Sequence, residues 1–250
     1  HRVWACSANN SSEDPAIVES NNLKTMAEEG CQRGEDCFWL RGLVPKDWTR
    51  CPEAEEFVAK TGEQRWEGGT FFLDGSGGER TRDRRLRRCG WATVKLKEEE
   101  EGSIKANYEQ AAFGSLGGKQ QTVPRAELKA AIETLKLCRQ GREDVVMHTD
   151  CLYVYKGANR GGVNMSKNLD LWDEYRELEE EYKEAGRSIR VVKVKAHAEY
   201  ADLLLDTLTW RQYAGNCLAD SFAKEGARLG RIEKSHADMV DQIDQMAWLV

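Results

Sequence analysis

The chain has 250 residues, of which 40% are hydrophobic and 32% are charged, and its formal net charge is −6. These values are typical of a soluble globular protein with one large domain and a substantial extension. No run of about 18 apolar residues occurs, so no transmembrane helix is predicted. The chain starts at His1, and no basic segment leads into an apolar stretch. We therefore expect no signal peptide and a start inside a longer reading frame.

The eight cysteines are widely spaced and form no Cys-x-x-Cys pair. Several lie within apolar segments, where a reduced thiol packs as a small hydrophobic group. We therefore expect an intracellular protein, with the nucleus and the cytoplasm both open. Cys31, Cys37 and Cys51 together with His1 suggest a zinc site, but their spacing matches no standard ligand pattern and none is predicted.

The net charge disfavours a nucleic-acid partner, but the charges are unevenly distributed. Residues 170–184 contain eight acids and two bases, and residues 79–88 contain six arginines and two acids. We interpret the acidic run as a solvated surface. The arginines are so dense that contact with phosphates is as good an interpretation as solvation.

Residues 1–66 are polar and rich in turns, and their tryptophans indicate some packing, so we interpret them as an N-terminal extension or connector. A regular pattern begins after Gly69. Three short runs of strand-forming residues, at 70–73, 89–96 and about 105–115, are separated by turn signals. They predict an antiparallel meander of three strands.

A helix is predicted from Pro124, because proline favours the first turn and an apolar stripe follows at helical spacing. Residues 145–149 predict a fourth strand and residues 188–195 a fifth. The remaining predicted elements are a short helix after Asp150, a helix at 169–185, a helix at about 215–229 and a C-terminal helical extension at 230–250. The sequence therefore predicts an α/β domain over 67–229, with a five-stranded mixed sheet flanked by helices.

Four carboxylates fall at places where the ends of these elements are expected to converge. Asp74 ends the first strand and Asp150 ends the fourth, whereas Glu127 lies in the first turn of the first long helix and Asp220 in the last helix. Singly, each has an ordinary structural explanation as a turn former or a helix-dipole partner. Together they converge on the crevice beyond the strand ends. Clustered carboxylates repel one another, and two Mg²⁺ ions are the natural neutralising partners beside phosphates.

Five segments resemble the successive motifs of the type 1 ribonuclease H family. They are Leu73-Asp74-Gly75-Ser76, Thr122-Val123-Pro124-Arg125-Ala126-Glu127-Leu128, His148-Thr149-Asp150, Val194-Lys195-Ala196-His197 and Asn216-Cys217-Leu218-Ala219-Asp220. The segment 168–172 is similar to the start of a later helix in that family. The resemblance covers roughly 69–228, and residues 1–66 and 230–250 lie outside it.

The resemblance implies an endonuclease that hydrolyses the RNA strand of RNA/DNA hybrids by two-metal-ion catalysis. It implies Asp74, Glu127, Asp150 and Asp220 as ligands of two Mg²⁺ ions, with Mn²⁺ as a substitute. It also implies that His197, in a mobile loop, moves protons or assists product release. The substrate contacts that it implies are Gly75 and Ser76 near the RNA 2′-hydroxyls, Thr122 near a phosphate and Asn216 near the substrate backbone.

The chain departs from the family in several places. The loop from His197 to Asp220 is longer than usual, which puts the position of His197 in doubt. Val123 and Pro124 replace the asparagines of many members, and no basic helical protrusion is visible. We propose that residues 80–88 supply substitute phosphate contacts, with the arginines at 84, 85, 87 and 88 (Arg84, Arg85, Arg87 and Arg88) as the candidates.

Two alternatives remain beside the active hybrid nuclease. An inactive ribonuclease H-like module would bind nucleic acid or support a larger assembly. All four acids are present, whereas a domain that has lost its activity would be expected to have lost at least one of them. A transposase or integrase of the same superfamily fits the positions of Glu127, His197 and Asp220 poorly. The form of residues 122–128 is similar to versions in retroelement and cellular ribonuclease H domains. The missing start Met and the unmatched N-terminal region suggest a domain from a retroelement polyprotein, with a reverse transcriptase in the same parent polypeptide. The sequence predicts no oligomeric state.

Overall fold

The computed structural model describes residues 4, 6, 7, 13–62, 65–98, 107–159, 166–196, 200–205 and 208–248. The chain divides into two compact units, one made of residues 1–52 and 232–250 and the other of residues 53–231. Within the described ranges, no helix is both long enough and apolar enough to cross a membrane.

A six-stranded mixed sheet forms the centre of the larger unit, in the order β1-β4-β3-β2-β5-β6. Strands β1 to β4 pair antiparallel, whereas β5 pairs parallel with both β2 and β6. This arrangement confirms the predicted α/β class with a mixed sheet. The strand bounds are β1 Val58–Gly62, β2 Gly69–Ser76, β3 Gly90–Leu96, β4 Tyr108–Ser115, β5 Val145–Thr149 and β6 Ile189–Lys193.

The predicted number of five strands is wrong, because β1 adds a sixth at the edge of the sheet. The sequence analysis places this segment in the N-terminal extension, whereas it pairs along its whole length with β4. Its side chains alternate between exposed and half-buried, and it contains Lys60 and Gly62. A polar edge strand that buries so little apolar surface has almost no hydrophobic pattern for the sequence to reveal.

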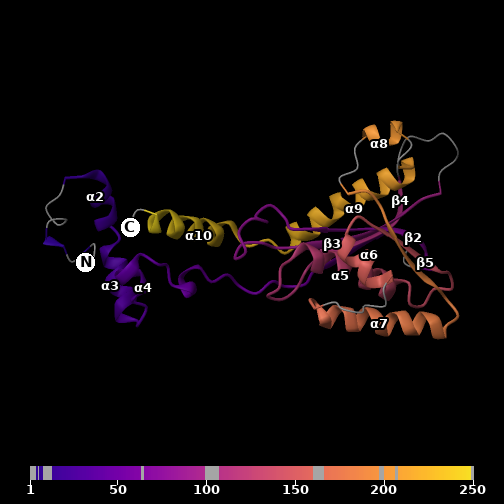
Figure 1. Ribbon diagram of the computed structural model, residues 1–250, viewed down its shortest axis with the longest axis horizontal. Helices are drawn as coiled ribbons and strands as arrows, with labels where there is room; N and C mark the ends of the chain where they lie inside the picture. The colour runs from indigo at the N-terminus through magenta and orange to yellow at the C-terminus, as the bar shows by residue number, and fades with distance from the viewer. Residues whose placement is uncertain are drawn as a thin grey trace. The chain divides into compact units, whose positions relative to one another are not determined.

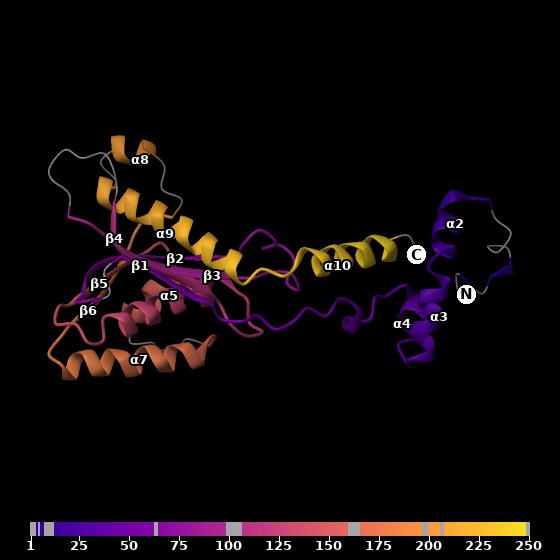
Figure 2. The same ribbon diagram turned by 180° about the vertical axis from the view of Figure 1, so that it is seen from behind.

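Helices cover both faces of the sheet (Figure 1). The helices α5 (Val123–Leu137), α6 (Leu152–Asn159) and α7 (Leu169–Glu184) lie on one side, and α9 (Trp210–Leu229) lies on the other (Figure 2). Along β2, Phe71 and Leu73 pack in the core that includes α5 and α7, while Phe72 packs in the core that includes α9. Burial on both faces explains why this strand is a continuous apolar run.

The acidic run of α7 is more than a solvated surface, because two of its acids pair with cations of α5 and a third pairs with Arg139, just after α5. Asp170 accepts hydrogen bonds from both terminal nitrogens of the Arg125 guanidinium. Glu174 lies 2.5 Å from Lys136, and Glu181 lies 2.6 Å from Arg139. Exposed ion pairs contribute at most about 1 kcal/mol each to the stability of the fold. We therefore interpret their role as fixing how α7 lies along α5.

The helix α9 begins at Trp210, five residues before the predicted start at 215. Thr209 and Gln212 form a capping box, in which each side chain accepts a hydrogen bond from the backbone of the other. A Thr-x-x-Gln spacing is a recognised helix-start signal that the apolar periodicity alone does not contain. The preceding helix α8 (Tyr200–Leu204) lies in the stretch between His197 and Asp220.

The smaller unit joins the two ends of the chain in one core. Its helices are α2 (Pro15–Asn21), α3 (Lys24–Gln32), α4 (Cys37–Arg41), the 3₁₀ helix η2 (Lys46–Thr49) and α10 (Lys234–Ala247). Trp4, Leu23 and Phe38 are buried together, and Met246 of α10 packs against them. The segment predicted as a C-terminal helical extension therefore contains a helix, and that helix packs with the N-terminal residues.

The close approach of α9 to β2 depends on Gly215. A Cβ atom at this position would lie 2.3 Å from the ring of Phe72. Ala is the better helix former by about 1 kcal/mol, but overpacking a core costs about 1–3 kcal/mol. We expect Gly215→Ala to lower the free energy of unfolding by about 1–2 kcal/mol in urea denaturation. Ser221→Ala, at an exposed position of the same helix, should leave that free energy unchanged or slightly raised; equal effects of the two changes would contradict the packing argument.

Candidate metal and nucleic-acid site

Two of the four predicted carboxylates lie at one edge of the sheet because β2 and β5 run parallel. Asp74 lies near the carboxyl end of β2, and Asp150 follows the last residue of β5. In this register Leu73 is opposite Thr149, so the two aspartates occupy equivalent places on neighbouring strands. The prediction that they converge at the strand ends is therefore met by the geometry.

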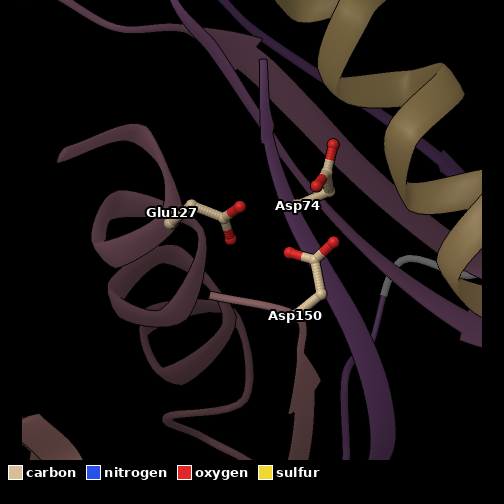
Figure 3. A group of neighbouring side chains, drawn as sticks. All are labelled: Asp74, Glu127 and Asp150. Carbon is tan, nitrogen blue, oxygen red and sulfur yellow. The ribbon is translucent and has the colours of Figure 1, made fainter. Parts of the chain in front are cut away.

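Glu127 completes a group of three carboxylates (Figure 3). One oxygen each from Asp74, Glu127 and Asp150 lie within 4.8 Å of one another. The structure corrects one detail, since Glu127 is not in the first turn of α5. Thr122 is the N-cap residue, and the first turn contains no acid. A favourable interaction with the helix dipole falls off within the first turn, so it does not explain this glutamate.

Gly75 allows α5 to approach the strand that carries Asp74. A Cβ atom on Gly75 would lie 2.7 Å from the backbone nitrogen of Glu127 and 2.9 Å from its Cγ. Contacts this short are closer than van der Waals distance, so any side chain here would displace the glutamate. The Thr149 hydroxyl lies 3.5 Å from Glu127 Oε2 and orients the carboxylate from β5.

Burial and mutual repulsion make the carboxylates resist ionisation. Burial, followed by the charges of Asp150 and Asp220, raises the pKa of Asp74 to about 7. Burial, followed by the charges of Asp74 and Asp150, raises the pKa of Glu127 well above its usual range. Hydrogen bonds from the Gly75 backbone oppose both shifts. The site therefore has a deficit of positive charge.

Asp220 lies near this group but is engaged by a lysine. Its carboxylate forms an ion pair with Lys224, one helical turn further along α9, at 2.7 Å. Its charge nevertheless acts on Asp74, which shows that the two carboxylates are near each other. Lys224 also acts on Asp74 and lowers its pKa. Of the four predicted acids, three thus form a group and the fourth flanks it.

The other predicted residues have varied surroundings. Ser76 is half-buried, and its hydroxyl accepts a hydrogen bond from the Gly78 backbone at 3.2 Å. Thr122 is exposed, and its hydroxyl makes no capping bond to α5. Asn216 is half-buried on α9, one turn before Asp220. His197 lies outside the described residues, so its predicted role stays a prediction.

Three of the four predicted arginines brace their own loop. Arg85 pairs with Asp83 at 2.7 Å, and Arg87 Nε donates to the Thr81 carbonyl at 2.6 Å. Arg88 is only 8% exposed and donates to the carbonyls of Arg87 and Arg85. Arg84, by contrast, is exposed.

The extra residues of the long loop after β6 are partly anchored. Asp202 of α8 is buried and forms an ion pair with Lys195. Arg211, at the start of α9, donates hydrogen bonds to the carbonyls of Leu96 and Lys97 at 3.3 and 3.1 Å. The first contact joins α8 to the segment just after β6, and the second ties the start of α9 to the end of β3.

The carboxylates fit a divalent cation on the chemistry of their donors. Asp74 and Glu127 are 8% and 3% exposed, and their oxygens are the hard ligands that Mg²⁺ prefers. Three such oxygens in one place are costly without a cation, as the raised pKa values of Asp74 and Glu127 show.

Two features escaped the sequence analysis. The first is Lys224, for which the signal was available as the i, i+4 spacing from Asp220. The second is the role of Gly75 in admitting Glu127, where the sequence suggested only contacts to substrate. That role depends on a residue 52 positions further along the chain, so no local pattern contains it.

The strand order, with an antiparallel meander extended by two parallel strands, defines an α/β fold of the ribonuclease H-like class. A family model described as RNase H matches residues 67–228, and the chain belongs to this family. The matched residues include all four predicted carboxylates. No curated protein matches the chain.

Solved structures of ribonuclease H proteins are similar to the chain at low identity. The protease–reverse transcriptase of prototype foamy virus is 22% identical with a TM-score of 0.47, and the match covers 66% of this chain and 21% of that one. The RNase H domain of PFV is 22% identical (TM-score 0.42; 66% and 96% covered). LC9-RNase H1 is 16% identical (TM-score 0.44; 71% and 83% covered). The chain thus spans about a fifth of the foamy virus polypeptide.

The raised pKa of Asp74 has a consequence for the metal-free protein. A carboxyl whose pKa is 3.8 when unfolded and about 7 when folded lowers stability as pH rises through that window, by up to about 4 kcal/mol. We expect Asp74→Asn to raise the Tm with a chelator present, by roughly 5 °C or more at pH 8 and by much less at pH 5. Thermal denaturation monitored by circular dichroism measures both.

Asp173→Asn is the matched control, because Asp173 is exposed on α7 and paired only with Arg176 in the described part of the chain. It should change the Tm little at either pH. If Asp74→Asn raises the Tm equally at pH 5 and pH 8, repulsion within the carboxylate group is not the cause.

Proposed function

We propose that this chain is an endonuclease that hydrolyses the RNA strand of RNA/DNA hybrids with two Mg²⁺ ions. The observation that carries the proposal is the convergence of Asp74, Glu127 and Asp150, within a domain of the RNase H family. Selectivity for hybrids rests on the family alone. Because all four acids are present, we favour an active enzyme over an inactive binding module.

Asp74, Glu127 and Asp150 would hold the ions, and Asp220 would serve as the fourth ligand. Bound there, the ions would supply the positive charge that activates a water and stabilises the phosphate and the leaving oxygen; Mn²⁺ would substitute. The chain itself contributes preorganisation, since Gly75 and Thr149 orient the glutamate before any ion binds. Lys224 pairs with one oxygen of Asp220, and any exchange of this pair would cost little because exposed pairs of this kind are weak.

Several residues would contact the substrate. The exposed Thr122 hydroxyl is free of α5 capping and would meet a phosphate. Asn216 would lie near the substrate backbone close to the scissile bond, and the backbone at Gly75 and Ser76 would lie near the 2′-hydroxyls that distinguish RNA from DNA. His197 would assist proton movement or product release. A reverse transcriptase in the same parent polypeptide stays a prediction.

A cleavage assay tests the proposal. With Mg²⁺, we expect the chain to cut the labelled RNA strand of a hybrid while leaving duplex RNA and duplex DNA intact. Asp74→Asn and Asp150→Asn should each reduce the rate by at least about 100-fold, because each removes a charged ligand. The rate is measured by gel electrophoresis under single-turnover conditions.

Asp173→Asn, which makes the same chemical change at an exposed position of α7 outside the carboxylate group, should retain the parental rate. Binding of the hybrid without cleavage by the parental chain would favour the inactive module. Cleavage that survives both site variants would reject the carboxylate group as the active site.

A further inference from the structure

The arginine-rich loop 77–89 lies at the same edge of the sheet as the carboxylates. It leaves the carboxyl end of β2 at Ser76, two residues after Asp74, and returns into β3. Its first residues contact the start of α5, since a Cβ on Gly77 would lie 3.3 Å from Val123. A Cβ on Gly78 would lie 3.3 Å from Ala227 in the last turn of α9. The loop therefore bridges α5 and α9 beside the proposed active site.

The loop is held in shape by its own side chains. Arg85, Arg87 and Arg88 are all committed to groups within residues 81–88, as described above. The hydrogen bonds from Arg85 also hold the pKa of Asp83 below its usual range. Three arginine side chains thus act as internal braces of the loop.

Arg82 and Arg84 differ from these braces. Both are exposed, and neither makes a hydrogen bond or an ion pair with the part of the chain that the structure describes. They flank Asp83, whose carboxylate is already occupied by Arg85. A preformed loop therefore presents two uncompensated guanidinium groups, and such groups match the geometry of phosphates.

We propose that Arg82 and Arg84 bind backbone phosphates of the nucleic-acid duplex engaged by the carboxylates, while Arg85, Arg87 and Arg88 shape the loop. This inference rests on the proposed function, because the duplex must occupy the same edge of the sheet. Of the phosphate contacts expected at residues 84, 85, 87 and 88, this inference keeps only Arg84 and adds Arg82. Because the loop is braced in advance, little ordering is needed when the duplex binds.

The test measures hybrid binding in an Asp150→Asn background, so that the substrate stays intact. Fluorescence anisotropy with a labelled hybrid, at several salt concentrations, yields the Kd and its salt dependence. We expect Arg82→Ala with Arg84→Ala to weaken binding roughly tenfold at low salt and to flatten the log–log salt slope by about 1–2. Arg88→Ala, in contrast, should lower the Tm because it removes a buried brace.

The matched control is Arg142→Ala with Lys183→Ala, which removes the same charge. Both residues are exposed near the opposite edge of the sheet, before β5 and near the end of α7. An unchanged Kd and slope for Arg82→Ala with Arg84→Ala, in a parental chain that cleaves hybrids, would overturn this inference alone. Equal weakening by the control pair would overturn it too, since net charge would then be the cause. A parental chain that neither binds nor cleaves hybrids would overturn the proposed function with it.

Discussion

The repulsion between buried carboxylates is the constraint on which the rest of this structure depends. Asp74, Glu127 and Asp150 are brought together by a parallel strand pair and by a helix that passes close over Gly75. Folding therefore brings carboxylates together at this end of the strands although their charges repel one another. The raised pKa values of Asp74 and Glu127 reflect this repulsion and the burial of the two groups. A site that is unfavourable alone and favourable with cations is suited to holding metal beside phosphate.

Charges elsewhere in the larger unit are arranged to support that edge. Acids of α7 pair with cations of α5 and of the residues just after it, which aligns the helix that carries Glu127. On the other side of the site, Lys224 engages Asp220 and lowers the pKa of Asp74. The arginine-rich loop adds positive charge where a polyanion would lie. The net charge of −6 is thus the sum of separate acidic and basic regions, which have different roles in the domain.

Much of the fold could be predicted because its core elements have strong local patterns. Strand β2 is a continuous apolar run, and α5 has an apolar stripe at helical spacing, so both were predicted within a few residues. Strand β1 was missed because its alternation is weak and it contains lysine and glycine. The start of α9 was misplaced because a capping box, and not apolar periodicity, sets it. The arginines were predicted to contact phosphates, because the sequence does not distinguish an arginine that braces its own loop from one that is exposed.

The sequence by itself determined the element types and the four carboxylates, because periodicity and the residues at strand ends are local properties. It also pointed to the family that the domain match shows. Only the tertiary structure decided that three acids form one group while Asp220 pairs with Lys224. It also decided that Arg85, Arg87 and Arg88 brace a loop from which Arg82 and Arg84 project. These outcomes depend on distances between side chains that only the folded chain brings together, so no local pattern encodes them.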